Sequence, residues 1–256
     1  MSSFKDKLVF ITGGASGIGK AMAESFATDG ATVCIGDIGD GTEVAKAIGG
    51  AYYKLDVTDE DNTRAVYRAI EDEYGKLDVI CLVAGVALED TTLEELDMGK
   101  ARKMIDINLL GMILGLKYGT QHMKDGGAIV TVGSAAGGGM TVAMQGVYSA
   151  TKAGVHYLTR TVAIEQGDRG IRANTLCPAS IAGTGMMIDE DESPEAKFFG
   201  GITALGRMGR PADVVNMAKF LASDEASFIT GGEFTVDGGL TAGLSNSLVG
   251  ALWGTQ

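Results

Sequence analysis

Tyr148 and Lys152 lie four residues apart in a stretch, residues 146–165, whose apolar side chains recur with helical spacing. Residues four apart on a helix share one side, so the phenol and the ammonium would be neighbours. A free tyrosine has a pKa near ~10, and a nearby ammonium lowers that value because it stabilises the phenolate. A decrease of about three units corresponds to roughly 4 kcal/mol of interaction. The pair therefore predicts a phenol that exchanges a proton near neutral pH, as a general acid or base does.

A glycine-rich stretch, residues 12–19, follows the apolar run 8–11, which we predict to be the first strand. Glycines allow a pyrophosphate to approach the backbone closely, and a helix N-terminus supplies N–H donors. The common G-x-G-x-x-G spacing is not met, because Met22 stands at the third glycine position. A Walker A loop is also disfavoured, since Ala21 lacks the hydroxyl that binds Mg²⁺. The stretch therefore indicates a dinucleotide site rather than a kinase or NTPase.

Asp37 follows Gly17 by twenty residues, at the end of the predicted second strand. A carboxylate in this place accepts hydrogen bonds from the adenosine ribose hydroxyls and repels a 2′-phosphate. No lysine or arginine occurs in residues 12–19 or 31–42 to neutralise such a phosphate. We therefore predict NAD rather than NADP as the cofactor. The alternative is that Asp37 is an ordinary exposed residue of an acidic loop.

Short apolar segments alternate with helical segments along the whole chain. We predict strands at residues 8–11, 32–35, 52–55, 79–83, 128–132, 172–176 and 233–236. Helices are predicted from the glycine-rich stretch to residue 29 and at residues 43–48, 58–74, 93–122, 146–165 and 213–221. This alternation favours an α/β fold, a Rossmann-type doubly wound parallel sheet of about seven strands with helices on both faces. No linker or repeat interrupts it, so we expect a single domain over residues 1–256.

Composition excludes several classes of protein. The net charge of −12 argues against nucleic acid or an anionic membrane as a partner, since both require basic surface. No apolar run reaches the ~18 residues of a membrane span, and the N-terminus lacks the apolar core of a signal peptide. We therefore expect a cytoplasmic location. Cys34, Cys81 and Cys177 lie in apolar, strand-like segments without a C-x-x-C spacing, which favours buried, reduced thiols.

Two other kinds of chemistry are weakly represented. Ser149 and Lys152 fit the S-x-x-K pattern of serine acylases, but neither K-T-G nor S-D-N occurs in the sequence. His122 and His156 are the only histidines, and neither has a paired cysteine or follows a nucleophile-elbow pattern. We interpret both as structural residues and expect neither a catalytic triad nor a metal site.

Taken in order, the motifs resemble those of the short-chain dehydrogenase/reductase family over essentially the whole chain. The matching residues are Thr12-Gly13-x-x-x-Gly17-Ile18-Gly19, Asp56-Val57, Asn108, Ser134, Tyr148-x-x-x-Lys152, Arg207-x-Gly209-x-Pro211 and Val236-Asp237-Gly238-Gly239. Each motif alone is weak, and their order and spacing together are specific.

The resemblance implies four catalytic residues. Tyr148 would be the acid or base, and Lys152 would lower its pKa and bind the nicotinamide ribose. Ser134 would hydrogen-bond to the substrate oxygen and stabilise alkoxide character. Asn108 would anchor a water that relays protons from Lys152.

The resemblance also implies the residues that bind the cofactor. Asp56 and Val57 would hold the adenine, and the backbone of Ile181 would hold the carboxamide. The full implied set is Gly13, Ser16, Gly17, Ile18, Asp37, Asp56, Val57, Val83, Ala84, Tyr148, Lys152, Ile181 and Thr184.

Three positions depart from the family pattern. Leu82-Val83 stands where the family has Asn-Asn, from which we expect a local rearrangement. Ala179 replaces a glycine, which leaves the backbone less free. Gly183 replaces a threonine that here comes one place later, as Thr184, so its contact with the cofactor is open.

We predict an NAD-dependent alcohol dehydrogenase or ketoreductase that interconverts an uncharged, fairly apolar secondary alcohol and its ketone. Residues 183–206 contain no cationic cluster that would bind a charged group, so we expect an uncharged substrate. It would be cyclic, aromatic or steroid-like. Met140, Met144, Met186 and Met187 would line an adaptable apolar pocket, and the alternative is that they are ordinary packing residues. One alternative is a 3-oxoacyl-thioester (acyl-carrier-protein) reductase, which normally uses NADPH. A remote alternative is a non-catalytic NAD-binding protein.

Two segments are expected to have separate roles. Glycines flank an apolar and acidic stretch in residues 183–206, which favours a lid over the substrate. The resemblance implies a homotetramer. The tail, residues 241–256, is rich in apolar side chains that would be exposed in a monomer, so we expect it at a subunit interface.

Overall fold

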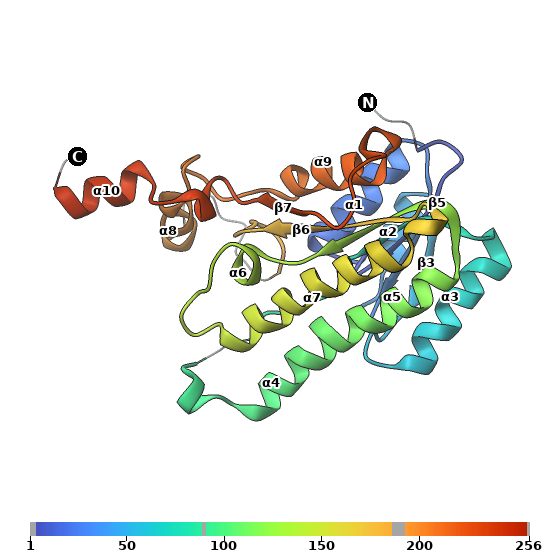
Figure 1. The fold of residues 1–256 in the computed structure, drawn as a ribbon, viewed down its shortest axis with the longest axis horizontal. Coiled ribbons are helices and arrows are strands. Elements are labelled where there is room, and N and C mark those ends of the chain that lie inside the picture. The colour runs from blue at the N-terminus through green and yellow to red at the C-terminus, as the bar shows by residue number, and fades with distance from the viewer. Residues whose placement is uncertain (1–3, 89–90, 186–192, 255–256) are drawn as a thin grey trace.

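The computed structural model describes residues 4–88, 91–185 and 193–254. Within them, seven parallel strands form one sheet in the order β3-β2-β1-β4-β5-β6-β7, which confirms the predicted doubly wound α/β fold (Figure 1). The strands are β1 (Leu8–Thr12), β2 (Thr32–Asp37), β3 (Ala51–Lys54), β4 (Leu77–Leu82), β5 (Met123–Val132), β6 (Arg172–Pro178) and β7 (Glu233–Val236). The strand order reverses between β1 and β4, and ligands of such sheets bind at this switch point, outside the carboxyl ends of the strands.

Ten α-helices lie in the described part of the chain. They are α1 (Gly17–Thr28), α2 (Thr42–Ala47), α3 (Glu60–Tyr74), α4 (Met98–Ile105), α5 (Gly111–Gln121), α6 (Ala135–Gly138), α7 (Gly146–Glu165), α8 (Pro194–Ile202), α9 (Pro211–Ala222) and α10 (Asn246–Trp253).

Side chains of successive strand residues enter two separate cores. Val9 and Ile11 of β1 pack with residues of α1 and α9 on one face of the sheet. Leu8 and Phe10 pack with residues of α3, α5 and α7 on the other face. Both faces are therefore covered, which explains why the strands are continuous apolar runs rather than alternating ones.

Tyr67 joins the second core to its helices. The side chain is fully buried on α3, and its hydroxyl donates to the carbonyl of Gly115 on α5 at 3.1 Å. Its ring contacts Phe10 edge to face, with the ring centroids 5.1 Å apart. One residue thus connects a sheet strand, α3 and α5.

The prediction of one continuous helix over residues 93–122 is wrong. Asp97 caps the start of α4 by accepting hydrogen bonds from two backbone N–H groups, at 2.7 and 3.0 Å, so the chain before it is not part of the helix. A π-helical turn, Asp106–Leu110, then separates α4 from α5. The extra residue in this turn changes the direction in which side chains leave the helix, and such turns often occur at functional sites. Asn108 lies within it.

Three helices were not predicted: the short α6, α8 and α10. Ser193 caps α8 and Ser245 caps α10 through their side chains, and Pro194 follows at the first position of α8. Helices α8 and α10 contact each other, and α10 extends away from the body of the molecule as a C-terminal arm (Figure 1).

The motif Arg207-x-Gly209-x-Pro211 organises the start of α9. Arg207 forms a bidentate pair with Asp213, at 2.8 and 3.1 Å, and Asp213 also accepts from the backbone N–H of Arg210. Gly209 exchanges backbone hydrogen bonds with Ser180 and Ala182 in the loop after β6. The motif therefore ties that loop, which borders the cavity described below, to α9.

A search of the described helices finds none with the length and apolar character that crossing a bilayer demands.

Replacing Tyr67 with phenylalanine is expected to destabilise the protein by about 1 kcal/mol, because it removes a buried hydrogen bond and preserves the ring. Urea denaturation measures the change. Tyr157→Phe is the matched control, since Tyr157 is 69% exposed on α7. Equal stability of the two variants would contradict the role given to the Tyr67 hydroxyl.

Candidate functional site

A cavity of about 970 Å³ opens at the carboxyl ends of strands β1 to β6. Its walls contain Ser134 and all the residues predicted to bind the cofactor: Gly13, Ser16, Gly17, Ile18, Asp37, Asp56, Val57, Val83, Ala84, Tyr148, Lys152, Ile181 and Thr184. Asn108 does not line the cavity and is buried behind it. The fold thus gathers segments from across the chain around one space.

Tyr148 and Lys152 occupy the first two turns of α7 and point to the same side, as predicted. The ammonium of Lys152 lies 5.8 Å from the centroid of the Tyr148 ring. Only 3% of Lys152 is exposed, and its Nζ donates to the carbonyl of Val132 at the end of β5, at 3.0 Å. The lysine therefore connects α7 to the strand that leads to Ser134.

Burial affects the two groups in opposite directions. It raises the pKa of the Tyr148 phenol, and the hydrogen bond between this phenol and Ser134 opposes the rise. Burial lowers the pKa of Lys152 to about 8, because desolvation penalises the ammonium. The expected net decrease in the phenol pKa is therefore not found in this geometry. The ammonium is directed at Val132, and desolvation of the phenolate outweighs the stabilising contacts.

Ser134 stands at the start of the short helix α6. Its Oγ accepts a hydrogen bond from the backbone N–H of Ala136 at 3.1 Å. The hydroxyl hydrogen can then be donated elsewhere, and the side chain borders the same cavity as Tyr148.

Asn108 is buried beside Gly85, a residue of the cavity wall. Its amide exchanges two hydrogen bonds of 2.8 Å with the backbone of Val86. A Cβ atom at Gly85 would lie 3.2 Å from both Asn108 Oδ1 and Lys152 Nζ, so these side chains approach the same point of the backbone. The π-helical turn thus brings Asn108 close to Lys152, and its role as a water anchor stays a prediction.

The glycine-rich loop is held against Asp37. One carboxylate oxygen of Asp37 accepts from the N–H of Ala15 at 3.0 Å, and the other accepts from Gly39 at 2.8 Å. Each oxygen retains a second lone pair for a ligand hydroxyl. A Cβ atom at Gly19 would overlap the carbonyl of Gly13, so this turn requires glycine.

Lys54 is a neighbour of Asp37 that the sequence did not indicate, because the two residues lie far apart along the chain. The two residues are register partners on β3 and β2. The ammonium of Lys54 donates to the carbonyl of Ile38, and the residue does not line the cavity. Only the strand pairing reveals this cation.

The rearrangement expected at Leu82-Val83 does not disturb the pairing of β4 with β1. Strand β4 stays in register with β1 up to the pair Leu82 and Thr12. The Thr12 hydroxyl accepts from the N–H groups of Val83 and Ala84, at 3.1 and 3.3 Å, and fixes the turn that follows. Leu82 is buried and packs close to Gly115 of α5, so an apolar residue suits this position.

The loop after β6 closes the opposite wall. Thr184 donates to the carbonyl of Ile181 at 2.9 Å. A Cβ atom at Gly17 would lie 3.3 Å from the backbone of Thr184, so the shifted threonine still faces the glycine-rich loop. Ala179 also borders the cavity.

Several residues of the cavity were not predicted. Arg102 and Lys103 line it from α4, on one stripe that also includes Gly99, Asp106 and Ile107. Gln145, Phe198 and Leu240 line it as well. The helical spacing of residues 99, 102–103 and 106–107 could have indicated this stripe, but not which way it faces.

The methionine predictions have a mixed outcome. Met140 lines the cavity. Met144 is exposed and does not. Met186 and Met187 lie outside the described residues.

The chemistry of an S-x-x-K acylase has no support. Ser149 Oγ is buried and has no hydrogen-bond partner among the described residues, whereas Lys152 binds Val132.

Cys34, Cys81 and Cys177 are free and buried, as predicted. The expectation that neither histidine has a paired cysteine is wrong, because His156 Nε2 lies 3.4 Å from Cys177 Sγ. The strand order, not sequence spacing, brings them together.

Comparisons with known proteins agree with this geometry. A family model described as enoyl-(acyl carrier protein) reductase matches residues 13–241. The chain is 39% identical to a cis-4-hydroxycyclohexanecarboxylate dehydrogenase of Sinomonas cyclohexanicum, over 94% of this chain and 98% of that one. It is 38% identical to a 3-alpha-(or 20-beta)-hydroxysteroid dehydrogenase of Mycobacterium bovis, over 96% and 94%.

Among solved structures, the chain resembles a short-chain type dehydrogenase/reductase from Mycobacterium ulcerans. The TM-score is 0.89 at 32% identity, covering 95% of this chain and 92% of that one. The strand order, the cavity and the extent of these matches lead to one conclusion. The protein belongs to the short-chain dehydrogenase/reductase family of nicotinamide-dependent oxidoreductases.

Proposed function

We propose that the protein is an NAD-dependent dehydrogenase that interconverts a fairly apolar, cyclic secondary alcohol and its ketone. The observation that carries this proposal is the cavity itself. Tyr148, Lys152 and Ser134 line one part of it, and the glycine-rich loop with Asp37 lines another. A proton-transfer group and a dinucleotide cradle therefore share one space.

The chain fits a nicotinamide dinucleotide. Gly13 and Gly17 have positive φ angles of 71° and 52°, and the backbone at Gly13 lies against Ala84 with no room for a side chain. This leaves a smooth turn at the N-terminus of α1, where backbone N–H groups attract a pyrophosphate. When bound, the nicotinamide supplies or accepts the hydride.

The side chains on the catalytic wall would move and hold the proton. In ketone reduction, the Tyr148 phenol donates its proton to the substrate oxygen, and the Ser134 hydroxyl donates a hydrogen bond to the same atom. In alcohol oxidation, the proton returns to Tyr148. Lys152 stabilises the phenolate that is left. Asn108 lies close to that lysine, because both side chains approach the backbone at Gly85.

Asp37 supports NAD as the cofactor. Its carboxylate is fixed by Ala15 and Gly39 at the end of β2, where it would accept from ribose hydroxyls and repel a 2′-phosphate. Lys54 does not line the cavity, and its ammonium donates to the carbonyl of Ile38.

The substrate part of the cavity favours an apolar ring. Side chains on this wall include Met140, Val142, Phe198, Phe199, Ile202 and Leu240. Phe198 and Phe199 contact each other edge to face, with centroids 5.2 Å apart. Dehydrogenases of a cyclic alcohol and of hydroxysteroids among the relatives support this class of substrate.

A second candidate is a cyclic alcohol that carries a carboxylate. Arg102 and Lys103 line the cavity and could bind an anion, which the prediction of an uncharged substrate did not include. The relative from Sinomonas cyclohexanicum is named for such a compound. Reduction of a 3-oxoacyl thioester remains the alternative, and the name of the matching family model shares with it only the acyl-carrier-protein thioester, since that name refers to an enoyl substrate. A non-catalytic NAD-binding protein would not need Tyr148, Lys152 and Ser134 around one cavity.

We also propose that residues 183–206 form a lid. Gly183 and Gly206 bound the segment with positive φ angles of 70°, a conformation that suits hinges. Phe198 and Phe199 on α8 belong to this segment and line the cavity. Residues 186–192, with most of the acidic run, lie outside the described part of the chain.

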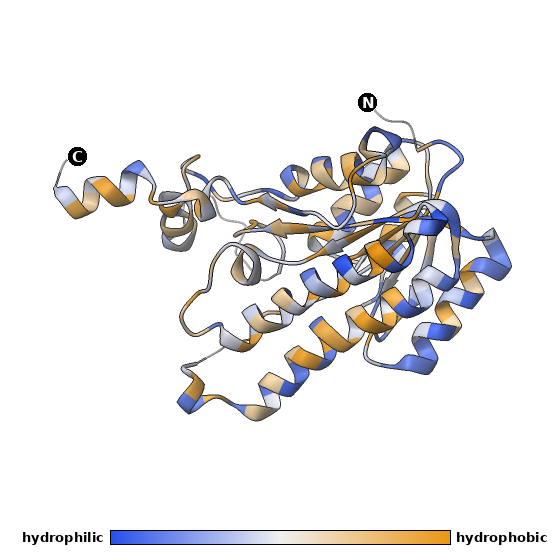
Figure 2. Cartoon of the chain, viewed as in Figure 1, coloured by the Kyte–Doolittle hydropathy of each residue, from blue (hydrophilic) through white to orange (hydrophobic). Residues whose placement is uncertain are grey.

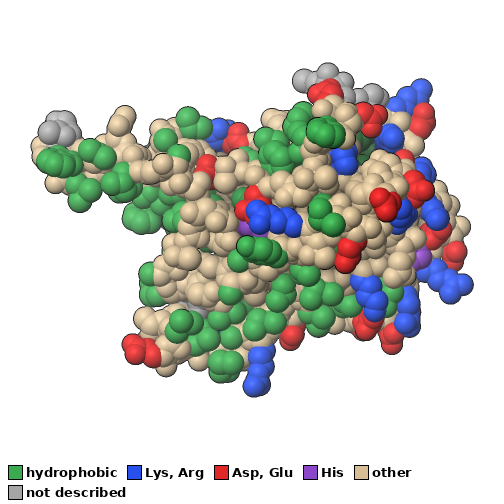
Figure 3. Space-filling model, in the orientation of Figure 1, with side chains coloured by type: hydrophobic (Ala, Val, Ile, Leu, Met, Phe, Trp, Pro, Cys, Tyr) green, Lys and Arg blue, Asp and Glu red, His purple; other side chains and the backbone are tan. Residues whose placement is uncertain are grey.

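A homotetramer is our proposal for the assembly. Hydrophobic residues recur along α4, α5 and α7 (Figure 2), and hydrophobic side chains gather on the surface in the region of these helices (Figure 3). The exposed ones include Ile105, Ile113 and Ile164. In the tail, residues 241–256, Leu244, Leu252 and Trp253 are each more than two-thirds exposed in this single chain. Burial of such side chains against another subunit would stabilise both regions.

A cytoplasmic location is proposed as well, because three free cysteines suit a reducing compartment.

Tyr148→Phe tests the proposed reaction directly. We expect kcat for alcohol oxidation with NAD to fall at least ~10³-fold, because the group that takes up the proton is absent. The dissociation constant for NADH, measured by fluorescence titration, should change by less than about threefold, since the ring is retained. A variant that keeps the wild-type rate would refute the proton-transfer assignment.

Asp37→Ala tests the choice of cofactor. We expect kcat/KM with NAD to fall about 10–100-fold and kcat/KM with NADP to rise, because hydrogen bonds to the ribose and repulsion of a 2′-phosphate are both lost. Asp40→Ala is the matched control from the same acidic loop, and it should leave the NAD to NADP ratio unchanged. A wild-type enzyme that works only with NADP would overturn the cofactor assignment.

Replacing both Leu252 and Trp253 with serine tests the role of the tail. The tetramer should be weaker, because apolar contacts are removed. We expect the protein concentration at which half of it has dissociated to be about 10–100-fold higher than for the wild type. Light scattering after size-exclusion chromatography measures the mass. Phe228→Ser is the control, since Phe228 is fully exposed far from the tail. An unchanged tetramer in the double variant would count against the interface.

A further inference from the structure

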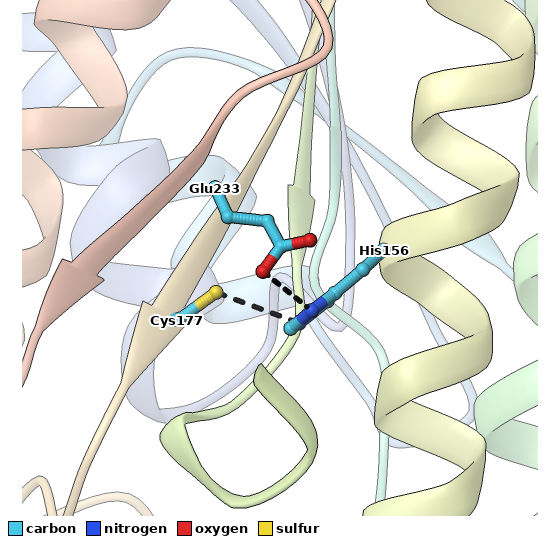
Figure 4. A group of neighbouring side chains, drawn as sticks. All are labelled: His156, Cys177 and Glu233. Atoms are coloured by element: carbon cyan, nitrogen blue, oxygen red, sulfur yellow. Dashed lines mark hydrogen bonds and ion pairs between the residues drawn. The ribbon is translucent and has the colours of Figure 1, made fainter. Parts of the chain in front are cut away.

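His156 lies one turn after Lys152 on α7 and is only 2% exposed. Both of its ring nitrogens have partners from the sheet (Figure 4). Nδ1 lies 3.1 Å from Glu233 Oε2 on β7, and Nε2 lies 3.4 Å from Cys177 Sγ on β6. Arg160, one turn further along α7, binds the other oxygen of Glu233 at 2.7 Å. Neither the sequence motifs nor the proposed reaction assigns a task to this network.

The contacts define the protons of the network. Burial raises the pKa of Cys177 to about 12, so the thiol keeps its hydrogen and can donate it. Burial lowers the pKa of His156, which favours the neutral imidazole. A carboxylate can only accept, so Nδ1–H donates to Glu233 and Nε2 accepts from the thiol of Cys177. One tautomer satisfies every group.

A metal ion is a weaker interpretation of the same three side chains. The carboxylate and the thiol approach different nitrogens of the ring, whereas a metal requires all three ligands to meet at one point (Figure 4). Arg160 already neutralises Glu233, and binding would also require the buried thiol to lose its proton.

The imidazole supports the loop that carries Ser134. A Cβ atom at Gly133 would overlap the ring, and one at Gly138 would lie 2.7 Å from its Cε1 atom. The backbone on both sides of Ser134 therefore rests directly on His156. Just before this loop, the carbonyl of Val132 accepts the hydrogen bond of Lys152. The position of one ring thus affects the backbone beneath two groups of the proposed reaction.

We propose that Glu233, His156 and Cys177 form a positioning network that sets the backbone of residues 132–138, and with it Ser134 and the hydrogen-bond acceptor of Lys152. His156 is the positioning residue, and it acts through this backbone without touching the substrate. The proposal rests on the proposed function for its effect on turnover. Its structural part is independent of that function.

The network also predicts a dependence on pH. The charged and titratable groups that face the ring are Glu233 on β7, Cys177 on β6, and Lys152 and Arg160 on α7. The pKa of the folded state lies below the unfolded value of ~6.5, so the folded state binds fewer protons. The stabilisation is present above pH ~6.5 and is lost as pH falls, because an imidazolium would turn an N–H toward the thiol that now donates to it.

The test compares His156→Leu, which leaves Cys177 and Glu233 without their partner, with His156→Gln, whose amide can both donate and accept. His122→Leu is the matched control, since His122 also contacts a glutamate, Glu71, but lies far from the loop that carries Ser134. We expect kcat to fall about 10²-fold in His156→Leu and less than about threefold in the other two variants. The affinity for NADH should stay within about twofold in all three.

Two measurements need no turnover. Amide hydrogen exchange in residues 132–138 should accelerate only in His156→Leu. Nitrogen NMR of labelled histidine should show neutral His156 with the proton on Nδ1 at pH 7. Unchanged exchange in His156→Leu, the other tautomer, or a stoichiometric metal ion in the purified protein would overturn the positioning network. If exchange and NMR agree while Tyr148→Phe keeps full activity, the network stands and only the proposed reaction fails.

Discussion

The structure depends on one buried cation. Lys152 has almost no access to water, and its ammonium is held by the carbonyl of Val132 at the end of β5. A charge in this environment is costly, and the lowered pKa of Lys152 records that cost. Because the lysine joins α7 to β5, the same contact fixes Tyr148 on the helix relative to Ser134 beyond the strand. The remaining walls of the cavity are built around this link.

The electrostatics of the pair differ from the simple picture of an ammonium that acidifies a phenol. Desolvation raises the pKa of Tyr148 above its ordinary value and lowers that of Lys152 to about 8, so the lysine becomes the group of the pair that loses its proton more readily. The first proton that the pair loses therefore leaves Lys152, near pH 8, and the neutral amine can then accept the proton of the phenol. The family resemblance pointed to these two residues, and burial has the larger influence on the pKa of both.

Much of the fold could be predicted because it follows from periodic patterns. The strands are short apolar runs, and α7 begins and ends where its pattern does. The break at residues 106–110 could not be predicted, since the apolar pattern continues through the π-helical turn. Helices α8 and α10 were missed because their few turns pack against each other rather than on the sheet. Contacts between segments far apart in the sequence could not be predicted from short stretches of it. Examples are Thr12 with Val83 and His156 with Cys177.

The central claim is that Tyr148 and Lys152 share a proton, and the pH dependence of kcat/KM for alcohol oxidation tests it most directly. Oxidation requires a pair that has already lost one proton, so the wild-type rate should rise through pH ~8 and then level off. In Lys152→Met, at saturating cofactor, this rise should move to higher pH by about one unit or more, because the group that loses its proton near pH 8 is removed and the buried phenol, whose pKa is raised, remains. A profile that is the same in both proteins would contradict the account.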